Sequence, residues 1–418
     1  MGRTERFRFS HSRKIDSADR YVSAAADAGV IMQSAQSGNG RSVNVNGEHL
    51  LNFGSCSYMA LERRPELRDG ARAALEEYGT QFSFSRAYLQ CALYLELEAL
   101  LEQIAGRPVM VTPSTTLGHM AALPILVRDD DFMIIDQFAH ASLQSAVQLV
   151  PGVPLTILRH SRMDQLDEQL TKLRDHPGLI WYIADGLYSM LGDFAPFDEL
   201  AQLLDRHPKL RLYIDDAHST SWLGRHGRGI ALEHFADDER VVVALSLNKA
   251  FAAAGGALAL PNRELLERMR RCGGPMLFSG PIQPPMLGAA LGSARLHLSE
   301  QFPSLQAELR ERLQVSERAL SRNGVELVTS TVSTIFQAQC DSPRITFAAA
   351  AELQARGFYC CICTFPAVPM NRPGLRFTVS RHNQPDDIEA FAAALSDTLA
   401  NVYRRELAPA PQLLEAGK

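Results

Sequence analysis

Acidic, imidazole and amine side chains directly follow apolar runs of the chain, where they can act on a bound ligand. Asp215, Asp216 and His218 follow one such run. Lys249 follows the next run and stands among small residues, where a planar ligand can approach the backbone. His140 follows an earlier run. Each side chain alone has an ordinary structural explanation, but together these carboxylates, imidazoles and amine form a set that indicates chemistry.

The elements that must position this set have the pattern of βα units. Between residues 105 and 262, short apolar runs alternate with amphipathic segments such as 164–173 and 197–204. The predicted strands are almost continuously apolar, as in a mostly parallel sheet covered by helices on both faces: 108–111, 132–135, 155–158, 179–183, 210–214, 241–245 and 256–260. Open α/β sheets bind ligands at the carboxyl ends of their strands, so Asp215 and Lys249 are expected to meet there.

The pattern changes after residue 285 and indicates a smaller α+β domain. A long helix is predicted over 286–322 and a closing helix from 385 to about 404. The predicted strands between them are 325–328, 334–338, 358–364 and 375–379. We therefore divide the chain into an N-terminal arm or segment (1–50), a large domain (51–285), a small C-terminal domain (286–405) and a tail (406–418).

Composition excludes several classes of protein. The 418 residues are 46% hydrophobic and 21% charged, which is typical of a globular protein. A net charge of −5 disfavours nucleic acid as a partner. The longest apolar runs fall short of the roughly 18 residues that cross a membrane, so no integral membrane association is expected.

The cysteines indicate a reducing compartment. Seven of them, an odd number in a long chain, argue against a disulfide framework and for a cytoplasmic protein. Cys360, Cys361 and Cys363 have a spacing that metal sites use, but no second pair follows. We interpret them as a buried, reduced strand, with a metal or redox role as the alternative, and we predict no metal site.

Ten short segments occur together in a characteristic order and spacing: Asn52–Tyr58, Ser85–Arg86, Phe138–Ser142, Asp185–Pro196, Asp215–His218, Gly224–Gly229, Ser246–Lys249, Phe278–Ser279, Pro366–Pro369 and Leu375–Arg376. On these segments the chain resembles the α-oxoamine synthases, pyridoxal-phosphate enzymes with the aspartate-aminotransferase-like fold (fold type I), over about residues 50–400. The segments beginning at Phe138, Asp185 and Ser246 resemble most the branch of ketone-autoinducer synthases.

The resemblance implies catalytic roles for four residues. Lys249 forms an imine with the aldehyde of pyridoxal 5'-phosphate and later takes a Cα proton from the substrate, which needs an amine of lowered pKa. Asp215 keeps the pyridine nitrogen protonated, so that the ring can accept electrons. His218 hydrogen-bonds the ring hydroxyl, and His140 stacks on the ring.

The resemblance also implies binding residues. Those predicted to hold the cofactor, beyond the catalytic four, are Ser114, Thr115, Thr116, Asp185, Ser189, Ser246 and Ser279. Hydroxyls and the backbone N–H groups of a helix N-terminus suit the phosphate. Ser279 reaches the phosphate of the partner's site in a homodimer whose sites lie at the subunit interface. Arg376 clamps the substrate carboxylate, and Tyr58 and Ser85 are further substrate-binding residues.

The implied reaction is a condensation of an amino acid with an acyl thioester. The thiol is released, and loss of CO₂ usually gives an α-aminoketone. The amino acid, the acyl chain and the carrier of the acyl group, coenzyme A or a carrier protein, stay open.

The chain departs from the family pattern at several positions. Phe82 and Phe84 replace glycines of the run before Ser85, which fills space at the entrance for the acyl donor. His119 and Asn248 replace a usual asparagine and a common serine. Thr364 replaces an arginine before the segment at Pro366.

Structural alternatives apply to each candidate. Asp215, Asp216 and the segment from Ser114 to Thr116 suit helix caps. Lys249 alone would be a surface lysine, His140 a structural histidine and Arg376 a member of an ion pair.

The same residues leave other functions open. Transamination or an aldol-type cleavage uses the same cofactor. A catalytically silent partner subunit would not need Lys249 beside Asp215 and His218. A nicotinamide dehydrogenase is disfavoured because no Gly-x-Gly-x-x-Gly opens a helix after the first strand.

Overall fold

The computed structural model describes residues 11–406. The first ten residues of the predicted N-terminal arm or segment, and the predicted tail beyond residue 406, lie outside this range. Two compact units divide the described residues. Unit 1 contains 11–55, 312–379 and 383–406, and unit 2 contains 56–311 and 380–382. Residues 286–311, predicted to belong to the small domain, group with unit 2.

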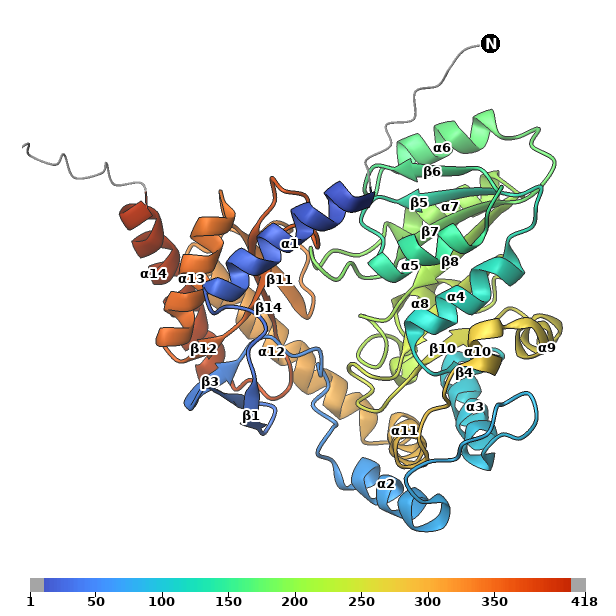
Figure 1. Ribbon diagram of the computed structural model, residues 1–418, viewed down its shortest axis with the longest axis horizontal. Coiled ribbons are helices and arrows are strands. Elements are labelled where there is room, and N and C mark those ends of the chain that lie inside the picture. Colours follow the sequence, from blue (N-terminus) through green and yellow to red (C-terminus); the bar gives the residue numbers. More distant parts are fainter. Residues whose placement is uncertain (1–10, 407–418) are drawn as a thin grey trace, which may run out of the picture. The chain divides into compact units, whose positions relative to one another are not determined.

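Unit 2 is built on a seven-stranded sheet in the order β4-β10-β9-β8-β7-β5-β6. Its strands are β4 (Val109–Thr112), β5 (Phe132–Asp136), β6 (Leu155–Leu158), β7 (Ile180–Asp185), β8 (Leu210–Asp215), β9 (Val241–Ser246) and β10 (Gly256–Ala259). β10 runs antiparallel to both of its neighbours, and the other paired strands run parallel. All seven predicted strands and the mostly parallel sheet are therefore confirmed (Figure 1).

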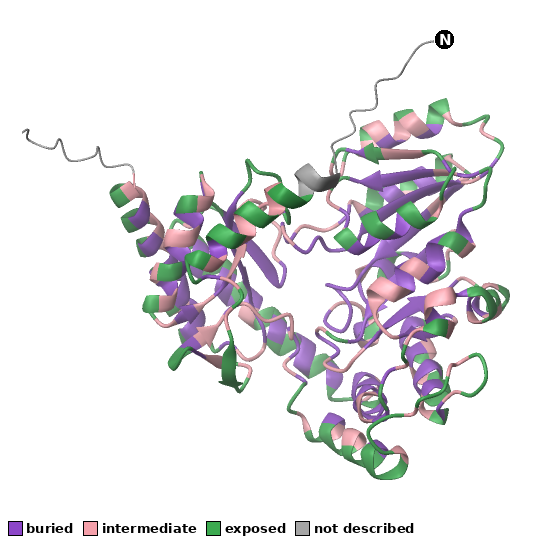
Figure 2. Cartoon of the chain, in the orientation of Figure 1, coloured by how far each residue is buried: buried purple, intermediate pink, exposed green. Residues whose placement is uncertain are grey.

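Both faces of this sheet are buried, as the continuous apolar runs predict. Tyr182 of β7 points into one hydrophobic core, while its neighbours Trp181 and Ile183 point into the other. Every residue of β7 and of β9 is buried (Figure 2). Fully burying one such apolar side chain contributes roughly 1.5–3 kcal/mol, so the central strands form a rigid frame for the residues at their ends.

Helices surround the sheet of unit 2. They are α2 (Pro65–Tyr78), α3 (Ala92–Ala105), α4 (Thr115–Leu126), α5 (Ala141–Ala146), η1 (Val147–Leu149), α6 (Met163–Lys172), α7 (Phe197–Arg206), η2 (Arg225–Gly227), α8 (Ile230–Phe235), α9 (Arg263–Cys272), α10 (Gly274–Phe278) and α11 (Pro284–His297). α6 and α7 confirm the predicted helices at 164–173 and 197–204. Helix α11 packs closely on α2, since a Cβ at Gly70 would lie 2.2 Å from the carbonyl oxygen of Gly288.

Unit 1 contains two smaller sheets. One has the order β1-β2-β3-β12, from β1 (Ala35–Gly38), β2 (Ser42–Val45), β3 (Glu48–Asn52) and β12 (Phe358–Tyr359). The other has the order β11-β14-β13, from β11 (Ile335–Gln339), β13 (Cys361–Cys363) and β14 (Gly374–Thr378). Its helices are α1 (His11–Asp27), α13 (Pro343–Ala355) and α14 (Pro385–Glu406), and α12 (Phe302–Arg322) enters it from unit 2. The mixture of strands and helices confirms the predicted α+β character.

Three local predictions for the C-terminal half are wrong. The helix predicted over 286–322 is two helices, because Pro303 cannot donate a backbone hydrogen bond inside a helix and instead stands in the first turn of α12. Residues 325–328 form no strand, since only Val328 donates a backbone bond to β11, at Gln337. The run 358–364 is divided between β12 and β13, which belong to different sheets.

The cysteine cluster is reduced and largely buried. Cys360 and Cys363 are buried, Cys361 is partly exposed, and all seven cysteines are free thiols. Burial raises the pKa of Cys363 to about 12, so the thiol stays protonated near neutral pH. Across residues 11–406, no helix is both long and apolar enough to span a bilayer.

Candidate functional site

A cavity of about 240 Å³ lies where β4, β5, β7, β8 and β9 end, at the carboxyl edge of the unit 2 sheet. Nine of the predicted catalytic and cofactor-binding residues line it: Ser114, Thr115, Thr116, His140, Asp185, Asp215, His218, Ser246 and Lys249. Ser142, Ala217 and Asn248 complete the lining. Segments spread over more than a hundred residues of sequence thus meet because parallel strands deliver their carboxyl ends to one edge.

Asp215 ends β8 as a buried carboxylate with two hydrogen-bond donors. Its Oδ2 lies 2.8 Å from Nε2 of His119, and its Oδ1 accepts the backbone N–H of Ala217 at 3.1 Å. Burial alone would raise the pKa of Asp215, but the neighbouring His119, which hydrogen-bonds the carboxylate, and Lys249 hold it below the usual range for a carboxyl group. Asp215 is therefore an anion at neutral pH.

Asp185 ends β7 directly beside Asp215 in the strand register. Its Oδ1 accepts the backbone N–H of His140 at 2.9 Å. Burial and the negative charge of Asp215 raise the pKa of Asp185 well above its ordinary value. Ionising two neighbouring buried carboxyl groups together costs electrostatic free energy, so the negative charge of the pair is on Asp215.

His140 caps the N-terminus of α5 and is held in one orientation. The backbone N–H of Ser142 donates to its Nδ1 at 3.3 Å, and Oγ of Ser142 lies 2.7 Å from the same nitrogen. Because Nδ1 accepts, the ring proton is on Nε2. Burial lowers the pKa of His140, so the ring is neutral and presents a flat face beside the cavity.

His218 follows β8 and contacts one predicted substrate-binding residue. The hydroxyl of Tyr58 lies 2.8 Å from its Nδ1. Trp222 donates from Nε1 to the backbone oxygen of His218 at 2.7 Å, which fixes the turn that carries the imidazole. Tyr58 is fully buried and does not line the cavity itself.

Hydroxyl groups and a helix N-terminus form one wall of the cavity. Oγ of Ser114 accepts the backbone N–H of Leu117 at 3.1 Å. Ser114 therefore caps α4, as its structural alternative predicts. The hydroxyl of Ser246 donates to Oδ1 of Asn248 at 2.6 Å. A Cβ at Gly256 would lie 2.6 Å from the backbone nitrogen of Thr115, so glycine is required for β10 to approach this turn. The positive end of α4 therefore faces the cavity and suits an anion.

Lys249 lies in a closed turn between β9 and β10. The backbone N–H of Leu247 donates to Gly255 at 3.0 Å, and that of Ala252 donates to Lys249 at 3.0 Å. The side chain is only partly buried and lines the cavity with Asp215 and His140. The set thus brings together one amine, one anionic carboxylate and two oriented imidazoles.

The other predicted site residues lie outside the cavity lining. Ser85 donates its hydroxyl to the carbonyl of Leu277 at 2.7 Å, and the hydroxyl of Ser279 donates to the carbonyl of Pro275. Ser189 is buried in the turn after β7. Arg376 is a buried residue of β14 in unit 1. Their predicted roles stay predictions.

His119 and Tyr213 had no predicted catalytic role. His119 is fully buried on α4, with Nδ1 2.9 Å from the hydroxyl of Tyr213 and Nε2 against Asp215. The signal in the sequence that could have pointed to His119 is its departure from the family pattern. Tyr213 lies two residues before Asp215 on β8, so both side chains point to the same face of the sheet.

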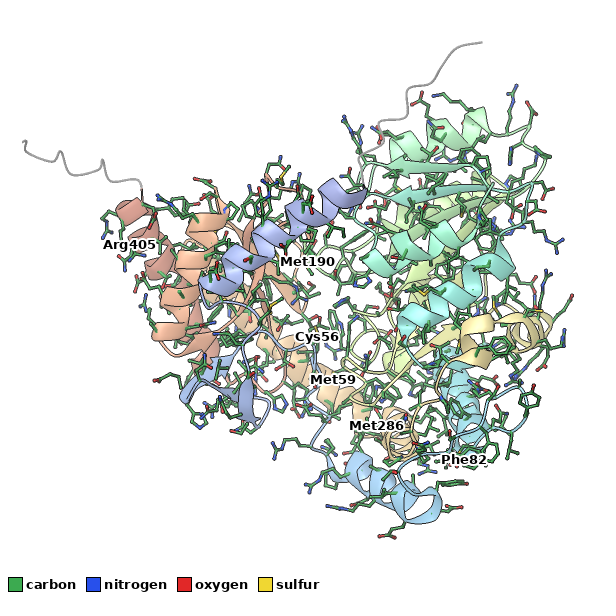
Figure 3. All side chains as sticks on the ribbon, viewed as in Figure 1. Cys56, Met59, Phe82, Met190, Met286 and Arg405 are labelled. Atoms are coloured by element: carbon green, nitrogen blue, oxygen red, sulfur yellow. The ribbon has the colours of Figure 1, made fainter. Side chains whose placement is uncertain are left out.

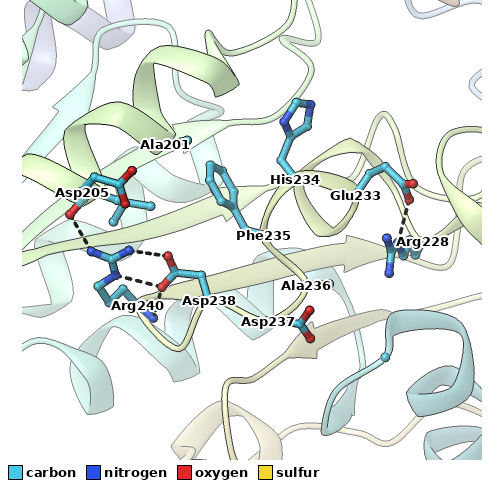
Figure 4. A pocket seen from close by; sticks show the side chains of 12 residues that line it. Ala201, Asp205, Arg228, Glu233, His234, Phe235, Ala236, Asp237, Asp238 and Arg240 are labelled. Atoms are coloured by element: carbon cyan, nitrogen blue, oxygen red, sulfur yellow. Dashed lines mark hydrogen bonds and ion pairs between the residues drawn. The ribbon is translucent and has the colours of Figure 1, made fainter.

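A larger cavity, of about 430 Å³, lies at the opposite edge of the sheet, near the amino ends of β4, β8 and β9 (Figure 4). Both arginines in its lining are paired with carboxylates. Arg228 pairs with Glu233 at 2.7 Å, and Arg240 pairs with Asp238 at 2.6 Å. This cavity contains no predicted site residue.

The family described as "Aminotransferase class I and II" matches residues 48–395. A putative 8-amino-7-oxononanoate synthase of Desulfovibrio desulfuricans is 30% identical, over 87% of this chain and 93% of the relative. The 4-hydroxy-2,2'-bipyrrole-5-methanol synthase PigH of a Serratia species is also 30% identical, over 84% of this chain and 54% of PigH, so the chain spans about half the length of that relative. The solved serine palmitoyltransferase of Sphingomonas wittichii has the same fold, with a TM-score of 0.86 at 22% identity over 94% of this chain and 99% of that one.

Proposed function

The chain belongs to the aminotransferase class I and II family and, within it, to the α-oxoamine synthases, and we propose that the residues of the 240 Å³ cavity carry out its condensation of an amino acid with an acyl thioester. The cofactor of this enzyme is pyridoxal 5'-phosphate. When bound, it supplies an electron sink that stabilises negative charge at the Cα of the amino acid. The observation that carries the proposal is that Lys249 and the anionic Asp215 line one cavity.

The residues present fit this cofactor. A buried anionic carboxylate, Asp215, matches a cationic ring nitrogen, and the neutral His140 supplies a flat aromatic face. The N-terminus of α4, with Thr115 and Thr116, offers N–H and hydroxyl donors for a phosphate. We assign His218 to the ring hydroxyl, with Tyr58 fixing its orientation.

Lys249 is the base in this proposal. Its amine would hold the cofactor through the aldehyde, and its Nζ would accept the Cα proton of the amino acid. The closed turn between β9 and β10 fixes the backbone that carries Lys249 at the cavity. Asp185, whose pKa is raised by burial and by Asp215, is the protonated member of the acid pair and holds the backbone of His140.

Arg376 is proposed to bind the substrate carboxylate through its planar guanidinium. Ser85 and Ser189 are proposed as further contacts to substrate and cofactor. Loss of CO₂ after condensation is part of the proposal, by analogy with the family. The seven free thiols support a reducing, cytoplasmic location.

We propose that the enzyme is a homodimer in which Ser279 contributes to the partner's site. Phe278, beside Ser279, is 85% exposed, and Tyr88 is 89% exposed. The bond from Ser85 to Leu277 joins the loop that carries Tyr88 to helix α10, which carries Phe278. Phe82, earlier in the same loop as Tyr88, is labelled in Figure 3. Large exposed aromatic side chains on adjoining segments favour a protein contact.

Light scattering tests this contact. Phe278→Ser is expected to shift the molecular mass from dimer toward monomer, because it removes a large apolar side chain from the proposed interface. Met32→Ser is the matched control, since Met32 is 79% exposed on unit 1. A wild-type protein that is monomeric at micromolar concentration contradicts the proposal.

The activity is tested by mixing the enzyme loaded with cofactor, an amino acid and an acyl thioester. Free thiol is expected to appear in equal amount to a product that contains a new carbon–carbon bond, as measured by mass spectrometry. The control omits the amino acid and reports simple thioester hydrolysis. Formation of a keto acid without thiol release would contradict the proposal and favour transamination.

A further inference from the structure

A buried chain of three side chains reaches the cavity from inside the protein. The hydroxyl of Tyr213 lies 2.9 Å from Nδ1 of His119, and Nε2 of His119 lies 2.8 Å from Oδ2 of Asp215. Of the three, only Asp215 lines the cavity. Tyr213 and His119 have no exposed surface, so neither touches solvent or a bound ligand directly.

We propose that His119, held by Tyr213, is a positioning residue that keeps the Asp215 carboxylate anionic and aimed at the ring nitrogen of the cofactor. This inference rests on the proposed role of Asp215. It goes beyond it because it assigns a role to His119 and Tyr213, two buried residues outside the cavity lining.

The hydrogen-bond pattern fixes the protonation of the chain. Burial raises the pKa of Tyr213 well above its ordinary value, so the phenol keeps its proton and donates it to Nδ1 of His119. A neutral imidazole that accepts at Nδ1 carries its proton on Nε2 and donates it to Asp215. In this arrangement the Tyr213 hydroxyl donates to His119, and His119 donates to Asp215, so each donor faces an acceptor. A charged imidazole would instead donate from both ring nitrogens, and the Tyr213 hydroxyl would then have to accept and turn its own hydrogen elsewhere.

These hydrogen bonds fix the orientation and the charge of the Asp215 carboxylate. Oδ2 accepts from His119 and Oδ1 accepts from the backbone of Ala217, so rotation of the group is blocked. A donor to a buried anion stabilises its charged form. Asp215 therefore keeps its negative charge although Asp185 lies beside it in the strand register.

The charged and titratable groups around Asp215 come from several elements. Lys249 follows β9, His140 precedes α5, Asp185 ends β7 and His119 lies on α4. Lys249 and His140 line the cavity, where a bound ligand can contact them. His119 is fully buried and lies outside the cavity lining.

Three variants test the role of His119. His119→Leu removes the donor to Asp215, His119→Gln retains an N–H donor, and Tyr213→Phe removes only the hydroxyl that orients the ring. We expect His119→Leu to weaken binding of pyridoxal phosphate to the apoenzyme by roughly 10- to 100-fold, the range for losing a hydrogen bond to a charged group. His119→Gln should recover most of this loss, and Tyr213→Phe should lose about 3-fold.

Two readouts do not depend on activity. The dissociation constant of the cofactor is measured by fluorescence, and the pH titration of its visible absorbance reports protonation at the ring. In ¹⁵N spectra of wild-type apoenzyme, His119 is expected to carry its proton on Nε2. Circular dichroism establishes that each variant is folded, and the Tyr213→Phe variant keeps the core volume if His119→Leu does not fold.

The outcomes separate this inference from the proposed function. Wild-type affinity and an unchanged pH titration in His119→Leu, or equal losses in the Leu and Gln variants, would overturn the positioning role alone. A proton on Nδ1 of His119 would overturn it as well. A wild-type protein that takes up no cofactor would overturn the proposed function and this inference together.

Discussion

Two cavities lie at opposite ends of the same strands, and the smaller one has the reactive character. At the amino ends of β4, β8 and β9, the 430 Å³ cavity holds charges that pair with one another, such as Arg240 with Asp238. At the carboxyl ends, the 240 Å³ cavity holds an anionic Asp215 and an amine at Lys249, with the donors to Asp215 arranged behind it. The comparison teaches that the kinds of side chain in the lining, and not the volume, distinguish the reactive cavity from the other.

The largest effect is expected from Lys249→Ala. The variant lacks the amine that binds the aldehyde and moves the Cα proton, so the condensation rate should fall roughly a thousandfold or more. Product formation in single-turnover assays measures it. Arg228→Ala, in the larger cavity, is the matched control and should retain activity within a factor of about 2. Comparable losses in both variants would break the distinction between the two cavities.

Asp215→Asn should give the next largest effect. It removes a buried charge that the cofactor is proposed to pair with, and breaking such a pair costs about 3–5 kcal/mol. We expect cofactor affinity to fall by roughly two to three orders of magnitude, as measured by equilibrium dialysis. Asp238→Asn is the control at the other edge. Full cofactor affinity in Asp215→Asn would contradict the assignment.

His160, which pairs with two carboxylates at the carboxyl edge of the sheet, should affect the stability of the fold and not the condensation rate. His160 lies 3.1 Å from Asp136 and 2.8 Å from Asp193. Burial would lower the pKa of His160, but the two carboxylates raise it to about 9. The stabilisation from a raised histidine pKa is fully present below the unfolded value near 6.5 and is lost as the pH rises through about 9.

The expected size of this loss is about 2–3 kcal/mol in the free energy of unfolding between pH 6.5 and 9. Urea unfolding at several pH values measures it in wild-type protein and in His160→Gln, which lacks the titrating ring. Other groups titrate in both proteins, so the difference between the two curves isolates His160. Parallel curves would show that the pair contributes nothing.

The smallest effect is expected from Arg240→Ala in the larger cavity. Arg240 pairs with Asp238 and donates to the backbone oxygen of Leu204. Because the pair is partly exposed, its loss should cost only about 1 kcal/mol of stability. Urea unfolding measures this, and the condensation rate should stay at the wild-type value. A large loss of activity would show that the amino edge also takes part in catalysis.

Much of the large unit was predictable from sequence because its strands are buried on both faces. Continuous apolar runs located all seven strands, and the topology of a parallel sheet then brought Asp215, His218 and Lys249 to one edge. Ser114 caps α4 and also lines the cavity, so a structural role and a predicted binding role can belong to the same residue.

What sequence did not reveal depends on contacts between distant segments. Tyr213 looks like an ordinary strand residue, and only the packing of α4 on β8 places His119 between it and Asp215. Apolar residues at 325–328 suit a strand, but strand formation needs a neighbour with free backbone groups along its length. Pro303 was a visible signal that the long predicted helix divides in two.

Borohydride reduction followed by peptide mapping tests the central claim most directly. The purified enzyme should absorb in the visible region, lose that absorbance on reduction and yield one peptide that carries the reduced cofactor at Lys249. Asp215→Asn, loaded at high cofactor concentration, should be labelled at the same residue. A label on any other lysine, or a wild-type protein that takes up no cofactor, would contradict the account.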